Sequence, residues 1–147
     1  MSLSLQSPNQ PIQPTLMLLT HAPHHPLTQA GLVYAKQFCQ LLEPRHLPDN
    51  ATQLKIFLYS DAAYLANRLT WQPADMPNPT HAWQQLAKHY ALDLQVCVSV
   101  ALARGITDCD NAVRHGLAGD NLAQGFSLVG LGELAMALHA GYRVVQF

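Results

Sequence analysis

The sequence has little charge. Only 12% of its 147 residues are Asp, Glu, Lys or Arg, about half the share that is usual in soluble domains. The eight Lys and Arg are scattered singly and the formal net charge is −1, so direct, tight binding to a nucleic-acid backbone is not expected. Low charge also predicts that other subunits cover part of the surface, because monomers rarely expose large apolar patches. The alternative is a compact monomer with a nearly neutral surface.

Cysteines are few, and long apolar runs are absent. The three cysteines are Cys39, Cys97 and Cys109, an odd number without a CxxC pair, which excludes a disulfide framework or a zinc finger as the expected design. No apolar run reaches the length of a membrane span. The start, MSLSLQSPNQPIQPT, lacks the basic region and apolar stretch of a secretory signal. The expectation is a cytoplasmic protein that does not associate with membranes.

Apolar runs typical of buried strands alternate with amphipathic segments typical of helices. Strands are expected at residues 15–20, 54–59, 94–100 and 143–147, with residues 126–129 ambiguous between strand and loop. Helices are expected near residues 27–43, 60–69, 81–91, 111–117 and 131–140. This alternation predicts a single α/β domain, with a mostly parallel sheet covered by helices on both faces in a flavodoxin-like layering. Residues 1–14, rich in Pro, Gln and Ser, are expected to form a flexible N-terminal tail ahead of a domain at 15–147.

Small polar residues mark where two of these helices should begin. Thr28 is the expected N-cap of the first helix, after a proline-containing loop, HAPHHP. Thr80 is the expected N-cap of the helix at 81–91, because a threonine hydroxyl can accept a hydrogen bond from a free backbone N–H. On that helix the spacing predicts that Trp83 and Leu86 face the core.

Cys97 lies in the run LQVCVSVALARG. On the predicted third strand Val96 points to one face, whereas Cys97 shares the smaller and more polar face with Gln95 and Ser99. The cysteine lies toward the carboxyl end of its strand, where open parallel sheets bind ligands. Arg104 follows at the turn, where a cation would favour a thiolate or an anionic persulfide. Two interpretations stay open, a nucleophile and a buried structural cysteine.

The other two cysteines have simpler interpretations. Cys39 lies on the first predicted helix near Phe38, where packing is the expected role. Cys109 lies between Asp108 and Asp110, whose negative charges disfavour a thiolate. Cys109 is therefore interpreted as a surface residue.

Two further patterns could indicate a ligand site. His21, His24 and His25 crowd the loop after the first strand, but no carboxylate or cysteine accompanies them at metal-ligand spacing, which favours a solvated polar loop. GLGELA, at residues 130–135, matches the GxGxxA form of a dinucleotide fingerprint, yet the acidic residue about 20 positions later would fall beyond the end of the sequence. Gly130 and Gly132 are instead interpreted as close-packing positions at a helix start. No metal and no cofactor are expected.

Several stretches together resemble a known family. The run around Cys97, followed by GLA and NLAQGF within residues 116–126, then LVGLGELA and RVVQF, is similar to the TusD/DsrE family of sulfurtransferase subunits. Weaker agreement extends upstream through FLYSDAAYLANRLT and HAWQQLAKHYALDLQVC, so the resemblance covers residues 15–147. It implies a DsrE/F-like α/β domain. By position, Cys97 matches the persulfide-carrying cysteine of the family.

The resemblance also implies a function and partners. A sulfurtransferase subunit of this kind carries a persulfide in an intracellular sulfur relay that ends in 2-thiolation of the tRNA wobble uridine, without touching the RNA itself. The implied partners are TusB- and TusC-like sister subunits in a heterohexamer, a TusA-like sulfur donor and a TusE-like acceptor. Two alternatives remain, a DsrE-like subunit of dissimilatory sulfur oxidation and a non-catalytic scaffold subunit.

Overall fold

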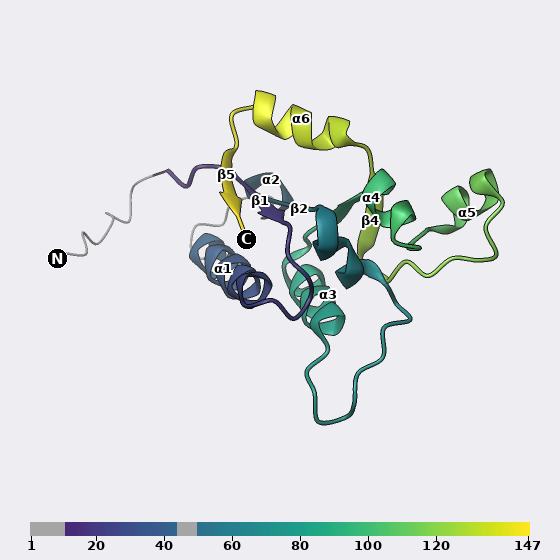
Figure 1. Cartoon of the computed structure of the whole chain (residues 1–147). Coiled ribbons are helices and arrows are strands. Elements are labelled where there is room, and N and C mark those ends of the chain that lie inside the picture. The colour runs from purple at the N-terminus through teal and green to yellow at the C-terminus, as the bar shows by residue number, and fades with distance from the viewer. Residues whose placement is uncertain (1–10, 44–49) are drawn as a thin grey trace.

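The computed structural model describes residues 11–43 and 50–147. Its strands are β1 (Thr15–Leu19), β2 (Leu54–Leu58), β3 (Leu94–Cys97), β4 (Phe126–Val129) and β5 (Arg143–Gln146). Its helices are α1 (Pro26–Leu42), α2 (Asn50–Gln53), the 3₁₀ helix η2 (Ser60–Ala66), α3 (Pro79–Tyr90), α4 (Val98–Ala103), α5 (Cys109–His115) and α6 (Leu131–His139). The strands form one parallel sheet in the order β4-β3-β2-β1-β5 (Figure 1). The predicted α/β fold with a parallel sheet is therefore confirmed, and the ambiguous segment 126–129 is a strand.

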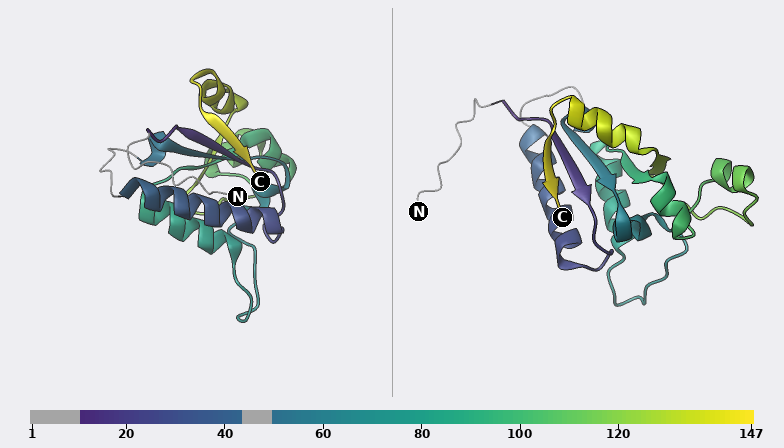
Figure 2. Two further views of the ribbon diagram at one scale, coloured as in Figure 1. Left: turned by 90° about the vertical axis from the view of Figure 1, so that its left-hand side faces the viewer. Right: turned by 45° about the horizontal axis from the view of Figure 1, so that its top comes forward.

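Helices cover both faces of the sheet, and the strand order explains how. The chain crosses from β1 to β2 and on to β3 in one direction, with α1 and α3 on one face, and then returns from β4 to β5 with α6 on the other face (Figure 2). Because parallel crossovers are right-handed, reversing the direction of travel moves the connecting helix to the opposite face. The two faces therefore carry separate apolar cores.

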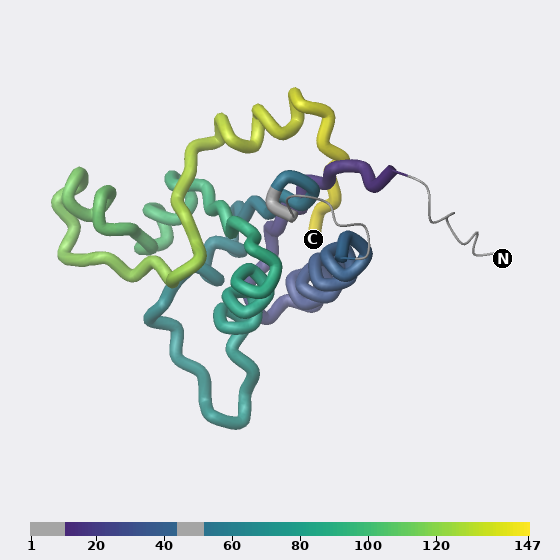
Figure 3. Tube along the Cα trace, turned by 180° about the vertical axis from the view of Figure 1, so that it is seen from behind, coloured from purple at the N-terminus to yellow at the C-terminus, as the bar shows by residue number. Residues whose placement is uncertain are grey.

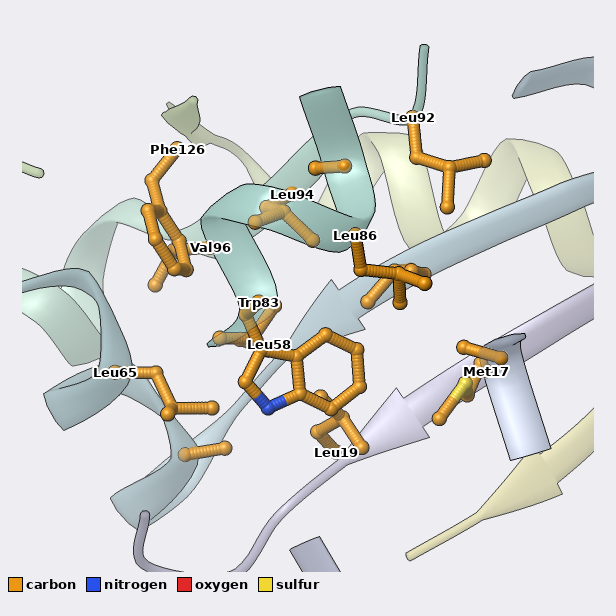
Figure 4. Close-up of a cluster of buried hydrophobic side chains, with 14 of the residues drawn as sticks. Met17, Leu19, Leu58, Leu65, Trp83, Leu86, Leu92, Leu94, Val96 and Phe126 are labelled. Atoms are coloured by element: carbon orange, nitrogen blue, oxygen red, sulfur yellow. The ribbon is translucent and has the colours of Figure 1, made fainter. Parts of the chain in front are cut away.

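The core between the sheet and helices α1 and α3 is the larger one. Trp83 and Leu86 of α3 are buried against Leu19 and Leu58 of the two central strands, beside Val96 of β3 (Figure 4). The predicted inward orientation of Trp83 and Leu86 is confirmed. An interior of this kind supplies most of the hydrophobic stabilisation of a small domain.

Both predicted N-caps are wrong. The α1 helix begins at Pro26, and the side chain of His25 caps it by accepting a hydrogen bond from the backbone of Leu27, since proline at the first helical position lacks only an N–H that the helix does not use. Asn78 caps α3 in the same way, one residue before a proline. The hydroxyls of Thr28 and Thr80 instead donate to backbone carbonyls of neighbouring segments.

The third strand is shorter than predicted. The sequence predicts a strand that reaches residue 100, but β3 ends at Cys97 and the chain turns directly into α4. Cys97 pairs with Val129, the last residue of β4, while β2 ends at Leu58, opposite Val96. Beyond this point a strand would find no partner for its backbone N–H and C=O groups, whereas a helix satisfies them internally.

The N-terminal segment contacts the last strand, and one connection extends outward from the domain. The first ten residues of the predicted N-terminal tail lie outside the described residues; of the rest, Ile12 packs partly against the core and the Pro14 carbonyl accepts a hydrogen bond from the backbone of Arg143. The segment between η2 and α3, residues 67–78, projects away from the sheet (Figure 3). Within the part of the chain that the structure describes, no helix is both long and apolar enough to span a bilayer.

Candidate functional site

Cys97 is the last residue of a central strand and the residue from which α4 starts. It therefore lies at the carboxyl edge of the sheet, as the sequence predicts, which is the edge where parallel sheets place their ligand sites. Its side chain is only 2% exposed. The position of Cys97 is suited to reactive chemistry, but its thiol is closed off from solvent.

The face on which Cys97 lies is apolar rather than polar. The thiol belongs to a buried cluster with Leu16, Phe57 and Ala137, from β1, β2 and α6. Strand parity correctly separates Cys97 from Val96, which lies in the core on the other face. The predicted small polar face is wrong, because it includes Ser99. Ser99 belongs to α4 and not to the strand.

Arg104 lies at the opposite end of α4 from Cys97. Its guanidinium donates to Asp61 Oδ1 at 3.1 Å and to the carbonyl of Val100 at 3.3 Å, and it lies over the ring of Tyr64 at 5.9 Å. A six-residue helix is about 9 Å long. The geometry therefore assigns Arg104 to tethering α4 to η2, while its predicted electrostatic help to Cys97 stays a prediction.

Ser60 has an unusual backbone conformation that the sequence pattern did not indicate. It follows β2 at the same edge as Cys97, and its φ of 52° lies in the left-handed region. Its helix, η2, packs against β3 and α4. Non-glycine residues in this conformation are uncommon and concentrate near functional sites. The run YSDAA contains no glycine or asparagine, the residues that usually indicate a left-handed backbone conformation.

The other two cysteines differ sharply in environment. Cys39 is 0% exposed on α1, and burial, followed by the nearby Glu43 carboxylate, raises the pKa of its thiol to about 11. This environment agrees with the predicted packing role and makes Cys39 a poor nucleophile. Cys109 begins α5 and is exposed, in agreement with its interpretation as a surface residue.

The histidine loop is held by its own contacts. The rings of His21 and His25 stack with centroids 4.2 Å apart, and His25 caps α1. The side-chain amide of Gln72 donates to His24 Nε2 at 3.0 Å. Among residues 11–43 and 50–147, no three His, Cys, Asp or Glu side chains lie together in a group that could hold a metal ion.

The glycines of GLGELA do not serve close packing. A Cβ atom built on Gly132 meets no atom within 4 Å among the described residues, and one built on Gly130 meets only the backbone nitrogen of Gly132, at 3.9 Å. The close-packing interpretation is therefore wrong. Gly130 joins β4 to α6, and Gly132 lies in the first turn of that helix.

Known proteins of similar sequence are named sulfurtransferases. The Yersinia pestis protein "Sulfurtransferase TusD" is 42% identical over 132 residues, which cover 88% of this chain and 95% of that protein. "Sulfurtransferase TusD" of Serratia proteamaculans is 38% identical over 130 residues, covering 88% and 96%. "Sulfurtransferase TusD homolog" of Vibrio vulnificus is 39% identical over 125 residues, covering 80% and 92%. These relatives support the predicted class of activity, sulfurtransferase.

A solved structure and a family model complete the comparison. The crystal structure of the ychN protein from E. coli superposes with a TM-score of 0.64 at 18% identity, covering 90% of this chain and 98% of that one, which confirms the fold. The model of the DsrE/DsrF-like family matches residues 16–147. The predicted resemblance is thus confirmed, and the chain belongs to the DsrE/DsrF-like family.

Proposed function

We propose that this chain is a sulfur-relay subunit in which Cys97 carries a persulfide between a donor and an acceptor protein. One observation carries the proposal: a cysteine ends a central strand at the carboxyl edge of the sheet, in a chain 38–42% identical to proteins named sulfurtransferases. The other cysteines fit the role less well, because Cys39 lies deep in the core and Cys109 lies on α5, outside the sheet.

The chemistry consists of two thiol exchanges. In the first, the Cys97 thiolate attacks the outer sulfur of a donor persulfide; the donor S–S bond breaks and the donor leaves as a thiolate, which takes up the proton that Cys97 gave up. In the second, an acceptor thiolate attacks the outer sulfur of the Cys97 persulfide, and Cys97 leaves as a thiolate. Each step transfers one sulfur atom without an external oxidant or reductant. Both depend on access and on thiolate character.

Exposed apolar side chains support the proposed assembly with sister subunits resembling TusB and TusC. Trp71 is 79% exposed on the projecting segment 67–78, and Leu69 and Met76 are exposed beside it. Leu131 and Met136 expose about half of their area on α6. Exposed apolar groups gathered on two elements are typical of interaction surfaces.

The relay we propose operates in the cytoplasm and serves 2-thiolation of the tRNA wobble uridine. A donor resembling TusA and an acceptor resembling TusE would then handle sulfur before and after Cys97. The chain itself would not bind the RNA, in keeping with its isolated cations and net charge of −1. In cells that lack the gene, we expect 2-thiouridine to disappear from tRNA, with rescue by the wild type but not by Cys97→Ser. Intact 2-thiouridine would instead support a role in sulfur oxidation.

The burial of Cys97 favours one other function, a non-catalytic scaffold.

A direct test of persulfide transfer against a scaffold role is incubation of the full chain with a persulfide donor, followed by mass spectrometry of the intact protein. We expect a gain of about 32 Da, one sulfur atom, on the wild type and on Cys109→Ser. Cys97→Ser should gain none. Equal labelling of Cys97→Ser, or no labelling of the wild type in the presence of the sister subunits, would leave the scaffold as the better description.

A further inference from the structure

Cys97 is closed in the structure, yet sulfur exchange requires two sulfur atoms in contact. At 2% exposure the thiol offers no room for a persulfide on another protein to approach in line. The proposed transfer therefore needs a conformation in which the cover over Cys97 has moved. The need for such a movement rests on the proposed function, whereas the packing around Cys97 does not depend on it.

The cover on the solvent side comes from α6, beside Val100 of α4, which also packs against the cluster. Leu16 and Phe57 of the sheet lie in the same cluster as Cys97, and Ala137 closes it from the helix. Leu134, one turn earlier on α6, packs against the cluster and is itself partly exposed. Figure 2 shows α6 as the helix that lies across this face of the sheet. Because Gly130, the N-cap of α6, directly follows the residue that pairs with Cys97, the first turns of α6 lie near the carboxyl edge.

The α6 helix is held less firmly than the helices on the other face. Ala137 is its buried residue, whereas Leu131, Met136 and Leu138 each expose about half of their area. On α3 the buried set contains large side chains, among them Trp83. Since the free energy of local opening follows the apolar area that is lost, an element attached through one alanine and a partly buried leucine opens at low cost.

Two glycines lie at the start of α6. Gly130 has a φ of −78°, which any residue can adopt, and a side chain at Gly132 would meet no described atom within 4 Å. Neither glycine is therefore required by this conformation. Each lowers the rigidity of the junction, and Gly132 also weakens the first helical turn relative to alanine.

We propose that α6 is a lid over Cys97 that opens at the junction Gly130–Gly132 and so exposes the thiol at the carboxyl edge of the sheet. In the closed state the lid protects Cys97 from oxidants and unrelated thiols. In the open state it admits the sulfur of a partner protein. The trade-off between a stable helix and an accessible thiol is set by the glycines and by Leu134.

Alkylation kinetics of the full chain test the lid without any sulfur donor. Iodoacetamide labelling, followed residue by residue with mass spectrometry, should be fastest at Cys109, intermediate at Cys97 and slowest at Cys39. Gly132→Ala stabilises the closed helix and should slow labelling of Cys97 about threefold. Leu134→Ala removes the main contact of the lid and should speed it at least about threefold. Leu138→Ala, the same change at an exposed residue of the same helix, is the matched control and should leave the rate unchanged.

Three outcomes would overturn the lid. Cys97 could be labelled at the same rate in Gly132→Ala, Leu134→Ala and the wild type. Cys39 could accelerate in parallel with Cys97 in Leu134→Ala, which would mean that the whole domain unfolds. Leu138→Ala could change the rate as much as Leu134→Ala does. If labelling follows the lid variants but no persulfide forms on Cys97, the proposed function fails while the lid stands.

Discussion

Cys39 and Cys97 are both buried, on opposite faces of the same sheet. Cys39 lies on the inner side of α1, in the large core that Trp83 and the central strands fill. Cys97 lies beneath α6 in a small cluster with Phe57 and two other buried residues. The exposed fractions, 0% and 2%, barely distinguish the two thiols. The two thiols differ in how firmly the helix on their face of the sheet is packed. Burial alone therefore does not predict which cysteine can react.

The largest difference should appear when one apolar side chain is removed from each face. Trp83→Ala leaves a large cavity in the α1/α3 core and should lower the free energy of unfolding by about 3–5 kcal/mol. Leu134→Ala, on the partly exposed lid, should lower it by about 1–2 kcal/mol. Urea denaturation followed by circular dichroism measures both. Equal losses would mean that the two faces are equally well packed.

Alkaline pH should act through the α1/α3 face. Burial and then Glu43 raise the pKa of Cys39 to about 11 in the folded chain and also raise the pKa of Tyr90. A thiol with a raised folded-state pKa stays protonated while the unfolded chain ionises from about pH 9 upward. The contribution of the protonated thiol to the free energy of unfolding is therefore fully present below this pH. It is lost as the pH rises toward 11, and the loss for Cys39 is about 2 kcal/mol.

Denaturation midpoints measured between pH 8 and 11 test this slope. Cys39→Ala should flatten it, leaving the contribution of Tyr90. Cys97→Ala, which leaves the Cys39 environment intact, should keep the wild-type slope. A slope unchanged in Cys39→Ala would contradict the assignment.

Serine substitutions should separate the two thiols by stability. A hydroxyl at residue 39 is confined to the deep core and should cost about 1–3 kcal/mol. Cys97→Ser should cost less than about 1 kcal/mol, because a hydroxyl beneath the lid reaches water when α6 opens. Thermal midpoints of the two variants, measured side by side, check the order. A larger loss for Cys97→Ser would show that the α6 face is sealed as firmly as the other.

The smallest effect is expected for Arg104→Ala. The variant removes a partly exposed ion pair with Asp61, and such pairs contribute less than about 1 kcal/mol. Because the guanidinium tethers α4 to η2 at the far end of the helix from Cys97, alkylation of Cys97 should stay within about twofold of wild type. A large fall in the rate would restore the predicted electrostatic role of Arg104.

The sequence predicts the structure correctly where neighbours along the chain decide the outcome. The alternation of strands and helices, the inward face at Trp83 and the face of Cys97 relative to Val96 all follow from local periodicity. The predictions are wrong at Thr28, where a histidine followed by a proline begins the helix instead, and at Ser99. The end of β3 depends on where β2 and β4 end, which is information from distant segments.

The amino-acid order alone was enough for the α/β class, for the family and for placing Cys97 toward the carboxyl end of a strand, because these depend on residue spacing and on the run around the cysteine. It could not decide how the thiol is covered. That depends on α6, about 35 residues further along the chain, returning over the opposite face because the strand order reverses after β4. Burial is a property of what packs against a side chain, so only the tertiary structure could place Cys97 beneath a loosely held helix.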